Sequence, residues 1–255
     1  MSPTNLIDWP ATPSPAGQRY LPIEEQLLGP ALRELASRLP NAPSGVLAAL
    51  EFAGPNGIAD FVATVGFRRQ LAARLETSVP PITRASEVAV LSVVPVNRTV
   101  GSQAIARRLG FTDRQVQDAG RSLERVGAIQ RVGAGYRRHP GMEPVGRMYA
   151  LEAKVRDWRR ATSQALRYLT WADAAGVVLL HPPAQVEEAR GRLRELGIGL
   201  AIGSKWLVRP RIHPNRTALR FLASEVFVAS VWDSSDTARF VLPDALRSRI
   251  FFENF

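Results

Sequence analysis

The chain has 255 residues, and its 33 Lys and Arg against 23 Asp and Glu give a formal net charge of +10 at pH 7. It contains no cysteine, which excludes disulfide frameworks, cysteine zinc sites, iron–sulfur centres and thiol nucleophiles. No stretch approaches the roughly 18 apolar residues of a membrane span. We therefore expect a cytoplasmic protein without a membrane partner or an organic cofactor, and nucleic acid is the leading partner class because positive charge neutralises phosphates.

The first part of the chain combines a proline-rich start with a predicted hairpin. Residues 1–18 are typical of a disordered leader. Apolar positions then follow helical spacing over 21–39, where Pro30 should kink or restart the helix. Two apolar runs, 46–52 and 58–65, are separated by Ala53-Gly54-Pro55-Asn56-Gly57, and turn residues between runs of this length predict a β-hairpin.

Residues 84–139 form a distinct segment with three predicted helices, at 87–94, 100–109 and 113–126. A short strand, a glycine turn and a basic return strand follow. The stretch SQAIARRLGFTDRQVQDAGRSLERVGAIQRVGAGYRR resembles a winged helix-turn-helix domain. The resemblance implies that the third helix enters the major groove of DNA.

Two groups of side chains would then face DNA. On the third helix these are Arg114, Gln115, Gln117, Asp118 and Arg121, whose Arg and Gln types suit guanine and adenine edges. In the wing they are Tyr136, Arg137 and Arg138, which would contact phosphates. The alternative is that the winged helix serves as a protein–protein module.

Beyond Pro144, strands alternate with helices, which favours an α/β layer. The expected elements are strands at 145–155, 177–180, 198–202 and 206–208 and helices at 158–171 and 186–196. The tail from Thr217 to Phe255 is rich in aromatic residues. Its Phe251, Phe252 and Phe255 either complete the core or form the interface of a homodimer, which we expect because one recognition helix gives limited affinity.

The predicted strand 145–155 carries an acid and a base on one face. Period-two alternation places Glu152 beside Lys154, one of only two lysines in the chain, and leaves Tyr149 and Leu151 on the other face. An exposed ion pair of little energetic value would explain this pattern. A second explanation is phosphodiester hydrolysis, which needs carboxylates for Mg²⁺ and a cation near the attacking water.

Further carboxylates could join this pair. Asp60 interrupts an apolar run, where an unpaired acid would be costly, and Glu51 lies near the end of the preceding strand. For Asp60 alone, a hydrogen bond to a turn would be the structural alternative.

Asp60 followed by Glu152-Ala153-Lys154 resembles the PD-(D/E)xK nuclease superfamily. Gln164 and Tyr168 are similar to the Gln-x3-Tyr motif of its RecB-like branch. The resemblance implies a mixed sheet flanked by helices, a site with Mg²⁺ or Mn²⁺ held by Asp60 and Glu152, and a further ligand from Glu51, Glu25 or Glu24. The family places Pro before this Asp, where this chain has Ala59.

The spacing of these motifs predicts the domain organisation. Between Asp60 and Glu152 lie 91 residues, of which the winged-helix segment accounts for 56. We therefore expect a restriction-endonuclease-like α/β core, residues 19–83 and 140–255, with the winged helix inserted at 84–139.

Two functions fit this organisation. The first is a Mg²⁺-dependent endodeoxyribonuclease that the winged helix targets to double-stranded DNA. The second is a winged-helix transcriptional regulator whose nuclease-like core is non-catalytic and serves dimerisation or sensing. A purely structural Glu152–Lys154 pair in a protein-interaction domain is a third possibility.

Overall fold

The computed structural model describes residues 6–8, 27–229, 232–233 and 239–240. The chain divides into two compact units. Unit 1 consists of residues 1–67 and 146–215, and unit 2 of residues 68–145 and 216–255. None of the helices in the described ranges has the length and apolar character needed to cross a membrane.

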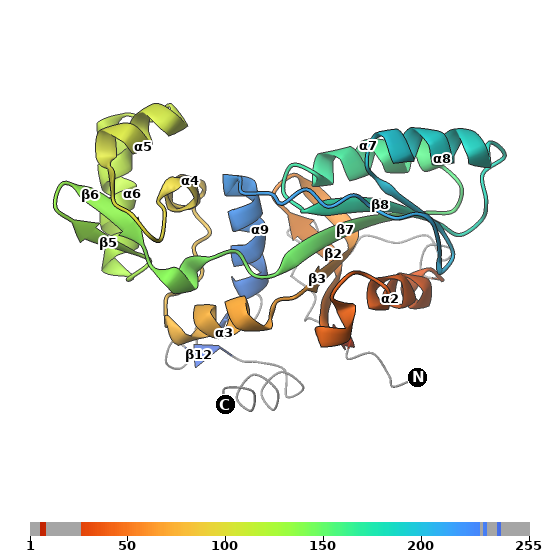
Figure 1. The fold of residues 1–255 in the computed structure, drawn as a ribbon, viewed down its shortest axis with the longest axis horizontal. Coiled ribbons are helices and arrows are strands. Elements are labelled where there is room, and N and C mark those ends of the chain that lie inside the picture. Colours follow the sequence, from red (N-terminus) through yellow and green to blue (C-terminus); the bar gives the residue numbers. More distant parts are fainter. Residues whose placement is uncertain (1–5, 9–26, 230–231, 234–238, 241–255) are drawn as a thin grey trace. The chain divides into compact units, whose positions relative to one another are not determined.

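Unit 1 is built on one mixed β-sheet (Figure 1). Its described strands are, in sheet order, β1 (Leu6–Asp8), β2 (Val46–Gly54), β3 (Gly57–Val65), β7 (Arg147–Lys154), β8 (Ala174–Leu179), β9 (Gly199–Ile202) and β10 (Lys205–Val208). The pairs β2–β3, β3–β7 and β9–β10 are antiparallel, whereas β7, β8 and β9 run parallel. The predicted α/β class with a mixed sheet flanked by helices is confirmed.

Strand β1 was not expected. Its residues 6–8 fall in the segment predicted as a disordered leader, yet they pair in parallel with residues 46–48 of β2. The edge of a sheet presents backbone N–H and C=O groups with which another extended segment can pair. Such pairing does not depend on composition, and it involves only three residues here, so the sequence did not reveal it.

Helices cover both faces of the unit 1 sheet. Helix α2 (Gly29–Ser37) packs on one face, and Pro30 lies in its first turn, where a proline costs little. Helices α7 (Trp158–Tyr168) and α8 (Val186–Glu195) lie on the other face (Figure 1). The short 3₁₀ helix η1 (Ala42–Ser44) leads into β2.

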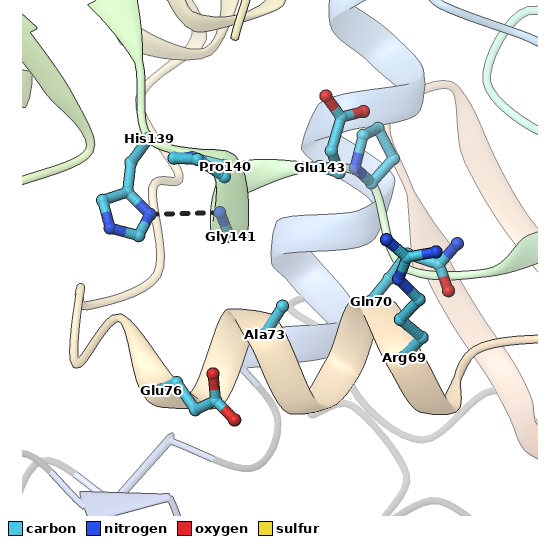
Figure 2. Close-up of a pocket in the computed structure, with 9 residues that line it drawn as sticks. Arg69, Gln70, Ala73, Glu76, His139, Pro140, Gly141 and Glu143 are labelled. Carbon is cyan, nitrogen blue, oxygen red and sulfur yellow. Dashed lines mark hydrogen bonds between the residues drawn. The ribbon is translucent and has the colours of Figure 1, made fainter. Parts of the chain in front are cut away.

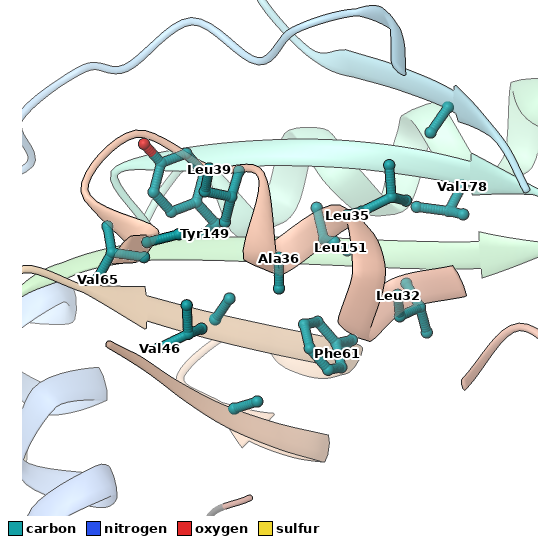
Figure 3. Packing of buried hydrophobic residues seen from close by; sticks show 14 of the residues in the cluster. Leu32, Leu35, Ala36, Leu39, Val46, Phe61, Val65, Tyr149, Leu151 and Val178 are labelled. Atoms are coloured by element: carbon teal, nitrogen blue, oxygen red, sulfur yellow. The ribbon is translucent and has the colours of Figure 1, made fainter. Parts of the chain in front are cut away.

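The core beneath α2 confirms the predicted alternation along β7. Tyr149, Leu151 and Ala153 pack with Leu35 of α2 and Phe61 of β3 in one buried apolar cluster (Figure 3). Alternate residues of a strand point to opposite faces, so Glu152 is left on the face covered by α7.

Unit 2 is mainly helical. It contains α3 (Arg68–Glu76), α4 (Ala85–Val93), β4 (Val100–Gly101), α5 (Ser102–Leu109), α6 (Asp113–Arg125), β5 (Ile129–Val132), β6 (Gly135–Arg138), η2 (Pro140–Met142), α9 (Ala218–Ala229) and the short antiparallel pair β11 (Trp232–Asp233) and β12 (Arg239–Phe240). Strands β4, β6 and β5 form a small antiparallel sheet in that order. The helices predicted between 87 and 126 are thus present.

The boundaries of unit 2 differ from those expected for the insertion, because α3 and α9 belong to the same unit as residues 84–139. Phe221 of α9 packs in the apolar core formed by α4, α5 and α6. Arg74 of α3 and Glu225 of α9 form a buried ion pair with an Nη2–Oε2 distance of 2.8 Å. The ion pair joins residues 151 positions apart in the sequence, and spacing along the chain does not reveal such a contact. Phe251, Phe252 and Phe255 lie outside the described residues.

Candidate functional site

Asp60 and β7 meet where the ladder between β3 and β7 ends. The last paired positions towards this edge are Phe61 and Leu151. Beyond them, Oδ2 of Asp60 accepts a hydrogen bond from the backbone N–H of Ala153 at 2.7 Å. The carboxylate thus replaces a missing ladder partner. The bond goes to a strand residue and not to a turn, which was the structural alternative for Asp60, and it fixes the Asp60 side chain beside β7.

Lys154 joins both carboxylates. Its Nζ lies 2.7 Å from Oε1 of Glu152 and 3.7 Å from Oδ2 of Asp60, and it donates to the carbonyl oxygen of Ala153 at 2.9 Å. Glu152 is fully buried, whereas the side chains of Lys154 and Asp60 are 16% and 19% exposed. The predicted pair is therefore no surface ion pair, because it forms one partly accessible cluster with Asp60.

Tyr168 closes the cluster from α7. Its Oη lies 2.5 Å from Oε2 of Glu152 and 2.7 Å from the carbonyl oxygen of Ile58. The phenol has one proton and the carbonyl can only accept. Both short contacts are therefore hydrogen bonds only when Glu152 itself carries a proton.

The electrostatics of the cluster agree with this arrangement. Burial raises the pKa of Glu152, and the negative charge of Asp60 raises it further, while the contacts with Lys154 and Tyr168 act in the opposite direction. Burial, followed by the charge of Glu152, also raises the pKa of Tyr168, which therefore stays neutral. Among the described residues, the carboxylates of Asp60 and Glu152 both lie within 4 Å of the Lys154 ammonium group.

The remaining predicted members are less closely connected. Gln164 lies one turn before Tyr168 on α7, and its buried Oε1 has no hydrogen-bond partner among the described residues. Glu51 faces Asp60 in the register of β2 and β3, but its backbone is left-handed, with φ of 47°, and the two residues are not paired. No hydrogen bond or ion pair of the described residues joins Glu51 to the cluster. Glu24 and Glu25 lie outside those residues.

The carboxylates of Asp60 and Glu152 are of the ligand type that Mg²⁺ takes in proteins. Within the described ranges, no group of three or more His, Cys, Asp or Glu side chains is arranged to hold a metal ion. Mg²⁺ is commonly bound by one or two carboxylates, with water and substrate phosphate as its other ligands. Asp60 and Glu152 are such a pair, and both side chains supply hard oxygen ligands.

Helix α6 presents a basic exposed face, but one predicted contact residue has another role. The side chains of Arg114 and Arg121 are 92% and 63% exposed, and both form ion pairs with Asp118. Gln117 is also exposed. In contrast, Oε1 of Gln115 accepts a hydrogen bond from the N–H of Thr112 at 2.8 Å, in a capping box that fixes the start of α6.

Of the three predicted wing residues, only Arg137 is exposed. The Tyr136 side chain is buried against α6, and Arg131 donates a hydrogen bond to its Oη at 3.0 Å. Arg138 is also buried, pairs with Glu143 at 2.7 Å and lies over the ring of Phe221. Tyr136 and Arg138, which were predicted to contact phosphates, are therefore buried within unit 2.

A hollow of about 660 Å³ lies elsewhere in unit 2, between α3 and residues 139–144 (Figure 2). Arg69, Glu76, His139 and Glu143 are among its lining residues. Nδ1 of His139 accepts a hydrogen bond from the N–H of Gly141, and Glu143 pairs with Arg138. The charges of the hollow are therefore mixed and partly paired within the unit, and it offers no concentrated charge of one sign.

Two contributors to these sites were missed from the sequence. The first is the carbonyl oxygen of Ile58, a backbone atom whose role cannot be recognised from the residue type. The second, Gly120 in the middle of α6, does have a sequence signal, because glycine is unfavourable in a helix. A Cβ atom there would lie 2.7 Å from the Tyr136 ring, so Gly120 makes room for the wing.

The chain matches no family model, and comparisons with curated proteins and with solved structures also gave no match. The function must therefore be argued from the residues themselves.

Proposed function

We propose that the protein is a Mg²⁺-dependent endodeoxyribonuclease of the PD-(D/E)xK type, cytoplasmic and associated with the nucleoid. The observation that carries this proposal is the position of Lys154, whose Nζ lies between the carboxylates of Glu152 and Asp60 at a partly exposed edge of the sheet. A structural ion pair needs one acid and one base. Here a second acid, Asp60, converges on the same ammonium group, and a pair of convergent carboxylates beside a lysine is the set of side chains that Mg²⁺-dependent phosphodiester hydrolysis uses.

Each member of the cluster has a role in phosphodiester hydrolysis. Asp60 and Glu152 would hold the metal ion, which when bound supplies positive charge to the phosphate undergoing substitution. Lys154 donates a hydrogen bond that orients the attacking water and offers its charge to a phosphate oxygen. Tyr168 orients the Glu152 carboxyl group through its Oη contact. Gln164 lies on the same helix with a buried oxygen available for a donor.

Residues 84–139 would target this activity to double-stranded DNA as a winged helix. Support comes from the order helix, strand, two helices and two strands, and from the sheet order β4-β6-β5. Arg114, Gln117 and Arg121 on α6 and Arg137 in the wing are exposed for such contacts. Because one recognition helix covers only a half-site, we propose that the protein acts as a homodimer.

Incubation with supercoiled plasmid tests the proposal directly. We expect nicking or linearisation with Mg²⁺ or Mn²⁺ and none with EDTA. Lys154→Ala should lose cleavage while duplex binding in EDTA stays within about twofold of wild type, a difference of less than about 0.5 kcal/mol. Lys205→Ala, which changes the other lysine at an exposed position of β10, is the matched control and should cleave normally. Equal activity of the two variants would exclude the assigned role of Lys154.

One observation favours the second candidate function, a DNA-binding regulator with a non-catalytic core. Lys154 already contacts Oε1 of Glu152 at 2.7 Å, and none of the described residues supplies a third carboxylate to the cluster. If the wild-type protein binds duplex DNA tightly but leaves the plasmid intact with either metal ion, the regulator is the better account.

A further inference from the structure

A hollow of about 480 Å³ lies next to the acid–lysine cluster, at the carboxyl ends of the parallel strands β7 and β8. Residues 156–159 form one side of it and residues 182–185 the other. The carboxyl ends of parallel strands are where open α/β sheets bind their ligands. The volume is within the range typical of small-molecule sites.

The hollow is tied to Lys154 through the backbone. The N–H of Leu180 donates to the carbonyl oxygen of Lys154 at 3.0 Å, and the N–H of His181 donates to that of Val155 at 3.0 Å. These two bonds hold the chain together just beyond both strands, directly before Arg156 and Pro182, which line the hollow. Arg156 follows Lys154 by two residues, just beyond the end of β7.

Arg159 provides a flat surface in this hollow. Its guanidinium group lies over the ring of Trp158, with Cζ 4.9 Å from the ring centroid. Its Nη2 donates to Glu188 at 2.9 Å and to Gln185 at 3.3 Å. These three contacts fix the plane of the group, and its side chain is still 62% exposed. Guanidinium planes held in this way are surfaces on which nucleobases stack.

Arg156 supplies positive charge at the same place. It is exposed, and no ion pair within the described part of the chain neutralises it. The acid beside it is engaged, because Oδ1 of Asp157 accepts from the N–H of Arg160 and caps α7. Buried Pro183 adds an apolar wall. The hollow thus combines the exposed guanidinium group of Arg156, the fixed guanidinium plane of Arg159 and the apolar surface of Pro183.

We propose that this hollow binds one nucleotide of a single DNA strand, next to the phosphate that is cleaved, with the base on Arg159 and its phosphate at Arg156. The position of the cleaved phosphate at Lys154 rests on the proposed nuclease function, whereas nucleotide binding in the hollow does not. The protein would therefore need a locally unpaired strand, because a stacked base in a duplex cannot reach Arg159.

Binding of a labelled single-stranded pentanucleotide in EDTA, measured by fluorescence anisotropy, tests this inference. We expect Arg156→Ala to weaken binding about tenfold, the effect of losing one charge-assisted hydrogen bond, and Arg156→Lys to restore part of it. Arg192→Ala, an exposed change on α8, is the control and should bind as wild type. Equal affinity of Arg156→Ala and wild type would overturn the proposal.

Two further measurements separate the possible outcomes. Competition with a free mononucleotide distinguishes a strand from a soluble nucleotide: we expect weak competition, and mononucleotide binding tighter than that of the pentanucleotide would overturn the DNA assignment. In plasmid cleavage, Arg156→Ala should raise KM and leave kcat within about twofold. If wild-type protein cleaves no DNA, the nuclease proposal fails, and the pentanucleotide measurement still decides whether the hollow binds a strand.

Discussion

Each unit contains a buried ion pair, and the two pairs are built in opposite ways. In unit 2, Arg74 donates to both carboxylate oxygens of Glu225, to Thr77 and to two backbone carbonyl groups. Glu225 also accepts from the N–H of Ile82. In unit 1, Lys154 faces two acids, and its side chain and that of Asp60 are partly open to solvent. The network of unit 2 is buried, whereas that of unit 1 brings two acids to one lysine and is partly open to solvent.

The comparison shows how a stabilising pair differs from a candidate active site. Closed networks hold segments together because every buried donor and acceptor has a partner. A group of acids and a lysine that is partly open to solvent can instead be reached by a cation, a proton or a substrate, and titratable groups with perturbed pKa values in such positions are candidates for functional sites. This contrast gives both networks measurable consequences.

The largest effect should come from Arg74→Met. The change leaves the Glu225 carboxylate buried without its partner, which typically costs about 3–5 kcal/mol of unfolding free energy. Urea unfolding followed by circular dichroism measures the loss. The double variant Arg74→Met, Glu225→Met should regain part of it, because the unpaired charge is removed. A single variant as stable as wild type would show that the closed network does not stabilise unit 2.

Glu152→Gln should change how stability depends on pH. Because the folded-state pKa of Glu152 is raised above its ordinary value of 4.5, the folded protein binds more protons than the unfolded chain in the window above that value. Stability contributed by this group is therefore complete below about pH 4.5 and is lost as the pH rises through the raised pKa. Urea midpoints at about pH 5 and pH 8 should differ less in Glu152→Gln than in wild type. An unchanged difference would contradict the assignment.

Two glycine-to-alanine changes within helices should have opposite signs. In Gly120→Ala the new methyl group meets the buried Tyr136 ring, and we expect a loss of about 1–3 kcal/mol and weaker duplex binding as the wing shifts. In Gly191→Ala of α8 nothing lies within 4 Å of the new Cβ, so we expect a gain of about 0.5–1 kcal/mol. Unfolding and duplex titration measure both variants, and a stabilised Gly120→Ala would remove the role of Gly120.

The smallest expected effect is that of Glu51→Gly. Glycine relieves the left-handed backbone of Glu51 and should stabilise unit 1 by about 0.5–1 kcal/mol. Leu50→Gly, at a neighbouring position without a positive φ, should destabilise it. If Glu51→Gly abolishes metal-dependent cleavage while gaining stability, Glu51 contributes to the site despite its lack of a described contact.

The sequence predicted the parts of both units that depend on local patterns. Alternation along 145–155 correctly separated Glu152 from Leu151, and turn residues correctly marked the hairpin of β2 and β3. It did not predict burial. Tyr136 and Arg138 have the residue types of phosphate contacts, yet they fill the core of unit 2.

Interactions over long distances in the sequence were equally hidden. The pairing of Arg74 with Glu225 and of β1 with β2 depends on which segments meet in space. Gln115 is different, because Thr112 and Gln115 have the spacing of a capping box, and this signal was overlooked when Gln115 was assigned to DNA.

The order of the strands also determines when the acid–lysine cluster forms during synthesis. Strand β3 is antiparallel to β7 in the sheet, yet about 80 residues lie between them in the chain. At roughly 5–20 residues per second, the ribosome needs several seconds to supply β7 after β3 has emerged. Until then the nascent hairpin has an unpaired edge, and Asp60 has neither the Ala153 N–H nor Lys154 as a neighbour. A nascent chain that ends before residue 154 therefore cannot assemble the cluster.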